Sequence, residues 1–141
     1  MKLEKSIIVI RLMVGLVFLS EGLQKFLFPG ALGSGRFETL GIPAPSFFGP
    51  FVGSVEIVCG TLVVLGLFAR IAAIPLFGVI TVAILTTKVP QFLNKGFWVT
   101  AHDGRTDFSM LMGLIFLLLA GSGALSLDHK KALRKSSHSH R

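Results

Sequence analysis

Apolar residues in this sequence fall into four long, nearly continuous runs, separated by short polar or glycine-rich segments. The runs cover about residues 6–28, 47–68, 70–87 and 106–125. Each approaches the roughly 20 apolar residues that a helix needs to cross the hydrocarbon layer of a membrane. Barrel strands would instead alternate apolar and polar positions with a period of two. The pattern therefore predicts an all-α, polytopic membrane protein folded as a four-helix bundle.

The segments between the runs carry turn and helix-end signals. Residues 34–41 predict a short surface helix, which Gly41 ends in a left-handed conformation. The short turn at residues 66–70 joins the second and third runs into an antiparallel helical hairpin. Phe92 and Trp98 lie among polar residues between the third and fourth runs, a pattern typical of aromatic anchors at the membrane surface.

The composition agrees with a membrane location. Of the 141 residues, 52% are hydrophobic, and the mean hydropathy is +0.76. A soluble domain of this size cannot bury that much apolar surface. The length indicates one membrane domain, which we place at residues 1–128. Residues 129–141 are basic, rich in serine and histidine, and without periodicity, so we expect a disordered tail.

The net charge of +7 is better explained by membrane topology than by nucleic-acid binding. The basic residues flank the apolar runs, and no basic face with interleaved aromatic residues is present. An N-terminus in the cytoplasm leaves nine basic residues inside and five outside, as the positive-inside rule favours. The outer five are Lys25, Arg36, Lys88, Lys95 and Arg105. We therefore expect an inner-membrane protein with both termini in the cytoplasm.

Ionisable residues inside predicted membrane helices are costly, so each one is informative. The candidates are Arg11, Glu21 and Lys25 in the first run and Glu56 in the second. At about 100° per residue, Arg11, Gly22 and Lys25 share one face of the first helix, and Glu21 borders that face. Glu56 lies on a glycine-lined face of the second helix. Because small residues allow helices to approach closely, we expect these two faces to pack together.

Depth along the helices predicts which polar side chains meet. Glu21, Gln24, Lys25 and Glu56 are expected to share a pocket in the outer half of the bundle, with Arg11 deeper and reaching toward Glu56 or toward the cytoplasmic surface. One of two carboxylates that share a single lysine should hold a proton near neutral pH. The alternative is that these charges only hold the two helices in register.

The candidate site follows from this pocket and from the third connection, where His102 and Trp98 could lie at its mouth. Candidate catalytic residues are Glu56, Glu21 and Lys25. Candidate ligand-binding residues are Glu56, Lys25, Gln24, Arg11, His102 and Trp98.

Cys59 is the sequence's single cysteine, so the chain can form no internal disulfide and has no cysteine pair for thiol redox chemistry. The predicted membrane segments contain no histidine pair, and the sequence has no glycine-rich dinucleotide motif. We therefore predict no metal site and no cofactor held by the chain itself. If redox chemistry occurs, the group that is oxidised or reduced must be the substrate or a quinone.

Several short motifs, taken together and in order, resemble one known family. They are Arg11-Leu-Met-Val-Gly, Gly22-Leu-Gln-Lys-Phe, Leu40-Gly-Ile-Pro-Ala-Pro, Val52-Gly-Ser-Val-Glu-Ile-Val-Cys-Gly, Leu65-Gly-Leu-Phe-Ala-Arg and Gly121-Ser-Gly-Ala-Leu-Ser-Leu-Asp. Spread over residues 11–128, they resemble the DoxX family of small membrane proteins. The resemblance implies a four-helix membrane bundle and an association with quinone-linked oxidoreductase activity.

The residues and the resemblance leave three functions open. The leading hypothesis is a quinone-linked redox component or a subunit of a membrane oxidoreductase complex, in which Glu56 or Glu21 exchanges protons with the quinone and the aromatic third connection closes the pocket. The second is a non-enzymatic accessory or scaffold subunit. Small-solute transport is the weakest, because no broken helix or inverted repeat can be recognised. The expected partners are the lipid bilayer and other membrane subunits or a second copy of the chain.

Overall fold

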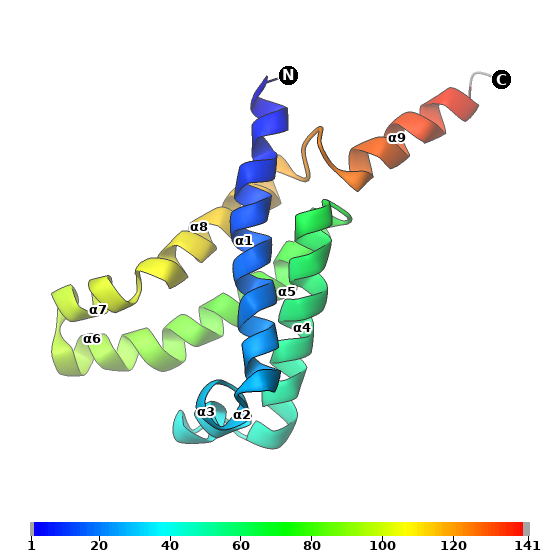
Figure 1. Ribbon diagram of the computed structural model, residues 1–141. Coiled ribbons are helices and arrows are strands. Elements are labelled where there is room, and N and C mark those ends of the chain that lie inside the picture. The colour runs from blue at the N-terminus through cyan, green and yellow to red at the C-terminus, as the bar shows by residue number, and fades with distance from the viewer. Residues whose placement is uncertain (1, 140–141) are drawn as a thin grey trace.

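The computed structural model describes residues 2–139, and within that range the chain is helical and contains no strand (Figure 1). The long helices are α1 (Lys2–Leu27), α4 (Pro45–Leu65), α5 (Ala69–Ala83) and α8 (Arg105–Ala120). Helix α5 continues through a π-helical turn, η1 (Ile84–Lys88), into α6 (Val89–Lys95). The predicted all-α class is confirmed.

Three helices are long and apolar enough to cross a membrane: α1, α4 and the continuous helix Ala69–Lys95. Helix α8 has 16 residues, which span about 24 Å and fall short of a hydrocarbon layer of roughly 30 Å. The fourth apolar run extends to residue 125, but its helix ends at Ala120. Gly121 and Gly123 follow with positive φ values of 78° and 77°, which end the helix. The predicted count of four spans is therefore approximate.

Helices α1 and α4 pack along most of their lengths through their glycine-lined faces (Figure 1). A Cβ atom built on Gly22 would lie 2.7 Å from the carbonyl oxygen of Gly53, and one built on Gly60 would lie 2.9 Å from that of Gly15. Backbones this close leave no room for a side chain. The predicted packing of these two faces is what the structure shows.

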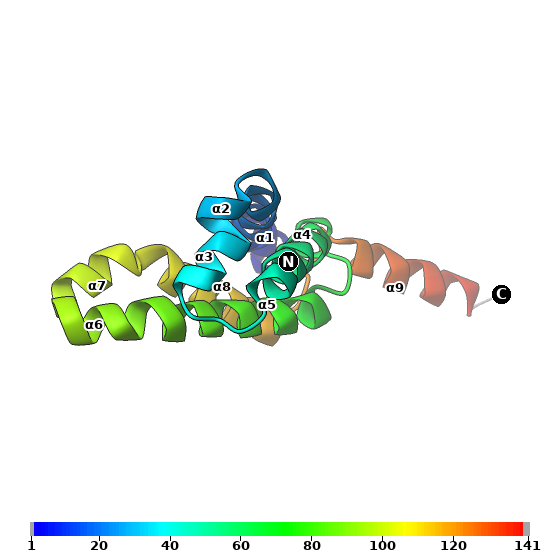
Figure 2. The ribbon, with the colours of Figure 1, turned by 90° about the horizontal axis from the view of Figure 1, so that it is seen from below.

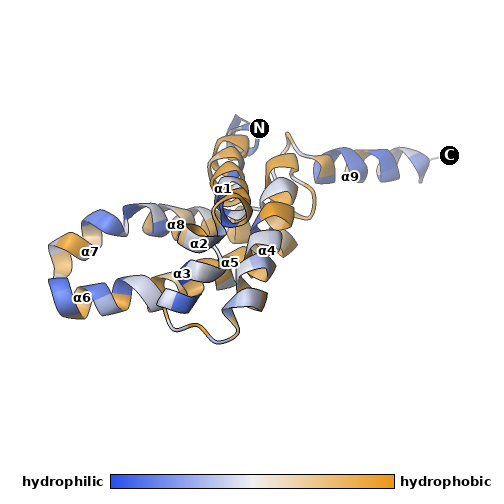
Figure 3. Ribbon diagram, turned by 60° about the horizontal axis from the view of Figure 1, so that its bottom comes forward, coloured by the Kyte–Doolittle hydropathy of each residue, from blue (hydrophilic) through white to orange (hydrophobic). Residues whose placement is uncertain are grey.

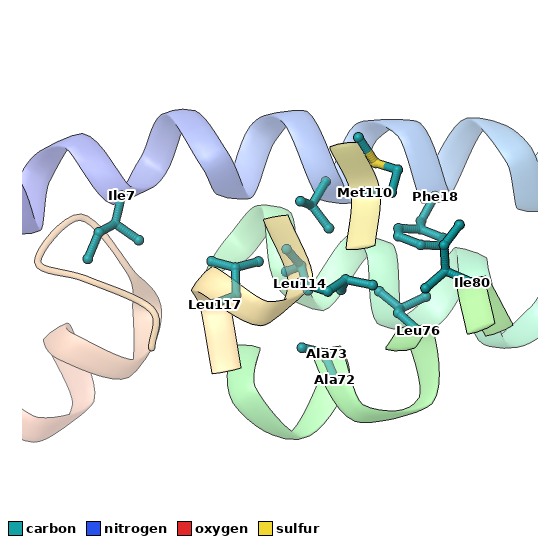
Figure 4. Close-up of a cluster of buried hydrophobic side chains, with 11 residues drawn as sticks. Ile7, Phe18, Ala72, Ala73, Leu76, Ile80, Met110, Leu114 and Leu117 are labelled. Carbon is teal, nitrogen blue, oxygen red and sulfur yellow. The ribbon is translucent and has the colours of Figure 1, made fainter. Parts of the chain in front are cut away.

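The second pair of helices diverges from the first. Helix α7 (Phe97–Asp103) leads into α8, and α5–α6 runs beside α7–α8 (Figures 1 and 2). The core lies where the two pairs cross, and it includes Phe18 of α1, Leu76 of α5 and Leu114 of α8 (Figure 4). Beyond this crossing the pairs separate, which leaves space between α4 and the η1 end of α5.

The connections largely follow the predictions. The first contains α2 (Pro29–Leu32) and the predicted short helix, α3 (Ser34–Thr39), after which Gly41 has a φ of 74°. Gly66 and Phe68 take left-handed conformations in the turn that joins α4 to α5. This turn produces the predicted antiparallel hairpin. The third connection is helical, as α6 and α7, and Trp98 on it is 82% exposed.

The C-terminal segment corrects the expectation of a disordered tail, because it forms α9 (Leu127–His138). The hydroxyl oxygen of Ser126 accepts a hydrogen bond of 3.1 Å from the N–H of His129 and so caps the helix. Asp128 in the first turn and Lys135 in the last complement the helix dipole. These end signals favour a helix although the segment lacks an apolar repeat. Residues 140 and 141 lie outside the described residues, and the domain boundary at 128 stays a prediction.

Asp128 also ties the beginning of α9 to the rest of the molecule. Its carboxylate accepts hydrogen bonds from the Ser122 hydroxyl at 2.6 Å and the Phe68 N–H at 3.0 Å. Burial raises the pKa of Asp128, but these bonds, a further one from the Ala69 N–H and the charge of Lys131 outweigh it, so the pKa is lowered below its ordinary value.

Candidate functional site

A cavity of about 790 Å³ lies between the α1–α4 pair and the α5–η1 helix, and α3 and residues 40–43 form part of its wall. Its volume falls in the range of roughly 300–1,000 Å³ that small-molecule sites occupy. The wall is mostly apolar. Its large apolar side chains include Phe37, Leu40, Phe48, Phe51, Val79 and Val82.

An ion pair between α1 and α4 lies in the wall of this cavity. The Lys25 Nζ donates a hydrogen bond of 2.8 Å to the Glu56 Oε2. The two side chains are only 11% and 4% exposed. The neighbouring Gly22 and Gly53 bring the two helices close enough for a lysine and a glutamate to meet directly. Two charges held this far from water are costly unless they are paired, which makes the pair the informative feature of the cavity.

Further charged side chains line the same cavity. Glu21 is exposed and adds a second carboxylate on α1, and Arg36 adds a cation from α3. The Lys88 Nζ lies 3.6 Å from the Asp107 Oδ2, so this second ion pair joins η1 to α8. It is more exposed than the first pair, and a pair of that kind contributes at most about 1 kcal/mol. The cavity thus has one buried ion pair and a more polar, exposed part.

The π-helical turn η1 places two hydroxyl groups in the cavity wall. Thr86 donates a hydrogen bond of 2.8 Å to the carbonyl oxygen of Val82, and Thr87 donates one of 2.6 Å to that of Ala83. A hydroxyl that donates in this way can still accept a hydrogen bond. Single π-helical turns within α-helices often occur at functional sites. The hydroxyl oxygens of η1 are therefore available as acceptors for a bound molecule.

The structure brings together Glu21, Lys25 and Glu56 but separates the other candidates from them. Gln24 does not line the cavity, and its side chain donates a hydrogen bond of 2.9 Å to the Ser20 hydroxyl. His102 and Trp98 lie on α7, exposed and outside the cavity wall. The expectation that the third connection closes the pocket does not fit this arrangement, because α6 and α7 extend away from the α1–α4 pair (Figure 1).

Arg11 also lies apart from the cavity, at the end of the molecule where α4 ends. Only 2% of it is exposed. Its guanidinium donates hydrogen bonds to the carbonyl oxygens of Val63, Val64, Ser122 and Leu125. Two of these carbonyls belong to the last turn of α4, where helical N–H donors run out; the Val63 carbonyl also accepts a hydrogen bond of 3.1 Å from the N–H of Gly66. The contacts of Arg11 therefore join α1 to two helix ends rather than to a ligand site.

Sequence reasoning missed the contributions of Arg36, Thr86, Thr87, Lys88 and Asp107 to the cavity. Lys88 and Asp107 carried a usable signal, since they have opposite charges and lie at the facing ends of the third and fourth apolar runs. The two threonines and Arg36 carried none, because their place depends on the π-helical turn and on how α3 folds back. A mostly apolar cavity with an ammonium group and a carboxylate can bind a small apolar molecule that carries a carbonyl or similar acceptor.

Comparisons with known proteins agree with this architecture. The DoxX family model matches residues 6–89. The chain is 57% identical over 135 residues to the "Uncharacterized membrane protein Rv3486" of Mycobacterium tuberculosis, an alignment that covers 92% of this chain and 83% of that protein. It is 31% identical over 128 residues to the "Putative oxidoreductase CatD" of Bacillus subtilis, covering 89% of this chain and 86% of that protein. No solved structure matches the chain significantly. The chain is a membrane protein and belongs to the DoxX family.

Proposed function

We propose that the cavity binds the head group of a membrane quinone and that the protein is a quinone-linked component of a membrane oxidoreductase complex. We also propose that it lies in the inner membrane with both termini in the cytoplasm, as the charge asymmetry favours. The observation that carries the proposal is the Lys25–Glu56 pair, because it is a buried polar pair in the wall of an otherwise mostly apolar cavity. The name of the Bacillus subtilis relative supports an oxidoreductase role.

The chemistry of a quinone fits the two kinds of surface in the cavity. Phe48 and Phe51 offer apolar contacts to a ring. Lys25 can donate a hydrogen bond to a quinone carbonyl oxygen, since an ammonium group has three donors and Glu56 takes one of them. A carbonyl group that enters this site meets a charged donor, and a hydrogen bond from a charged donor is stronger than one between neutral groups. The pair would therefore hold the head group in one orientation.

Reduction of a quinone to a quinol takes two electrons and two protons. In this proposal a partner subunit of the complex supplies the electrons, because the single Cys59 offers no thiol pair. Lys25 gives one proton to the reduced carbonyl oxygen that it contacts, and Glu56 stabilises the charge of Lys25 between turnovers. The second proton reaches the other oxygen of the quinone from water in the exposed part of the cavity. The exposed carboxylate of Glu21, in the wall of the same cavity, passes protons from water to the site. The proton that Lys25 gives to the quinone is thereby replaced from outside.

The test measures quinone affinity and melting temperature on the same Glu56→Gln sample in mild detergent. Glutamine keeps the shape of the side chain but removes its charge, so Lys25 loses its counter-charge and becomes a weaker donor. We expect quinone affinity to fall at least about tenfold, which corresponds to about 1.4 kcal/mol. The matched control is Glu38→Gln, the same change at an exposed position of α3 outside the cavity wall, which should leave affinity unchanged.

The same experiment separates the redox proposal from the structural alternative. If the ion pair only holds α1 and α4 in register, Glu56→Gln lowers the melting temperature and the folded fraction keeps its quinone affinity. That result would contradict the proposal. It would favour a non-enzymatic accessory subunit, which needs no ligand at this position.

A further inference from the structure

Helix α9 leaves the body of the molecule and is nearly free of packing. None of its residues is buried, and it projects away from the other helices (Figure 1). It is attached at its first turn, where the Asp128 N–H donates a hydrogen bond of 3.1 Å to the carbonyl oxygen of Gly66. A helix of 12 residues whose tertiary contacts are limited to those of Asp128 and Lys131 near its N-terminus is only marginally stable in water. We therefore expect that contact with the surface of another molecule stabilises α9.

The charges of α9 show what kind of surface that is. Its basic side chains are Lys130, Lys131, Arg134 and Lys135, and the helix is strongly hydrophilic (Figure 3). At 100° per residue these four fall within an arc of about 140°. The single acidic residue of the helix, Asp128, is already engaged with Ser122 and Phe68. Of the four basic side chains, Lys131 interacts with Asp128, and its Nζ lies 5.1 Å from the centroid of the Phe68 ring. Lys130, Arg134 and Lys135 form no ion pair among the described residues, so one side of α9 is a strip of positive charge that is largely uncompensated.

The position of α9 places this strip at the level of lipid head groups. The helix begins beside the turn of residues 66–68, which joins α4 and α5 at the ends of two membrane-crossing helices. The N-terminus of α1, with exposed Lys2 and Lys5, lies at the same end of the molecule (Figure 1). Basic segments immediately beyond a membrane span are attracted to anionic lipids.

We infer that α9 lies along the membrane surface and binds the head groups of anionic phospholipids through Lys130, Lys131, Arg134 and Lys135. Ala132 and Leu133 lie outside the basic arc, on a side that also carries His129 and Ser136. Leu133 is 58% exposed, so its side chain can reach the boundary between head groups and acyl chains. An acidic protein surface would match the charge equally well. Lipid is favoured because the attachment of α9 fixes it at head-group level. This inference is independent of the quinone proposal.

The test uses the full-length protein in lipid nanodiscs, with a polarity-sensitive fluorophore attached at Leu133→Cys in a Cys59→Ser background. Discs of phosphatidylcholine alone are compared with discs that also contain phosphatidylglycerol. With the anionic lipid present, we expect the emission to shift to the blue and an aqueous quencher to act severalfold more weakly. Added salt should reverse both changes, because it screens the attraction.

The matched variant replaces all four basic residues of α9 with glutamine, which keeps helix propensity and removes the charge. At about 1 kcal/mol for each cation, their loss should weaken the preference for anionic lipid by roughly a hundredfold or more. Lys95→Gln, a change on α6, should leave the response intact. The inference is overturned if the fluorophore responds equally in both kinds of disc, as docking on an acidic partner protein would predict. It is also overturned if the glutamine variant still distinguishes them.

Discussion

The contact between α1 and α4 can be tested with a single methyl group. An added Cβ at Gly60 would lie 2.9 Å from the carbonyl oxygen of Gly15 and 2.9 Å from the backbone nitrogen of Leu19. Both neighbours are backbone atoms, so no side-chain rotation relieves the clash. Gly60→Ala must therefore push the two helices apart. Gly78→Ala is the matched control, because a Cβ at this helical glycine of α5 meets nothing within 4 Å.

The size of the effect follows from the difference between the two variants. Overpacking at a site that cannot relax costs about 1–3 kcal/mol. Alanine also favours a helix over glycine by up to about 1 kcal/mol, but both variants share this gain. The free energy of unfolding of Gly60→Ala should thus lie about 1–3 kcal/mol below that of Gly78→Ala. Gly60→Leu, which adds more atoms in the same place, should lose more.

Unfolding in detergent, followed by circular dichroism and by the melting temperature, measures this difference. The Gly78→Ala protein should be as stable as the wild type or slightly more so. Equal stability of Gly60→Ala and Gly78→Ala would refute the reasoning, because it would mean that the backbones of α1 and α4 do not approach as closely as these distances require. In that case the glycine-lined face of α4 would point toward lipid.

Two further predictions concern topology and pH. In a Cys59→Ser background, Ser6→Cys and Ser137→Cys should resist an impermeant thiol reagent in intact cells while Lys95→Cys reacts; the reverse pattern would overturn the proposed orientation. Asp128→Asn should lower the melting temperature at neutral pH, because the folded state lowers the pKa of Asp128, so the ionised group stabilises the fold above its unfolded pKa. This contribution is lost as the pH falls below about 4, so a difference from the wild type that persists under acidic conditions would contradict the assignment.

The helices and their closest contact could be predicted from the sequence because both depend on local patterns. Apolar runs long enough to cross a membrane predict helices, and glycines at helical spacing predict which faces meet. The meeting of Lys25 and Glu56 followed from their depth and from the helix faces on which they lie, since a charge in a membrane helix needs a partner at its own level. Each of these inferences uses only positions along and around a helix, which follow from residue spacing.

The shape of the cavity could not be predicted, because it depends on angles between helices. The divergence of α5–α6 from α4 opens the cavity, and the pattern of apolar residues does not predict the angle between these helices. The same limit explains why the partners of Arg11 could not be named, although one of its two expected directions, away from Glu56, is the one that the side chain takes. Its partners are the carbonyl oxygens of Val63, Val64, Ser122 and Leu125. Every residue has a backbone carbonyl, so the residue types do not indicate which carbonyls will accept these hydrogen bonds.

The positions of Arg11 and Lys25 on α1 bear on the role of the buried ion pair. Arg11 already fixes α1 against α4 near the end of α4, and the glycine contacts hold the two helices together along their length. Register is therefore set without Lys25 and Glu56, and a buried ion pair is a costly way to add to it. Apolar residues in their place would pack the same contact at lower cost. Their presence in the wall of a cavity, rather than within the packed core, supports the proposal that the pair serves a ligand rather than helix packing.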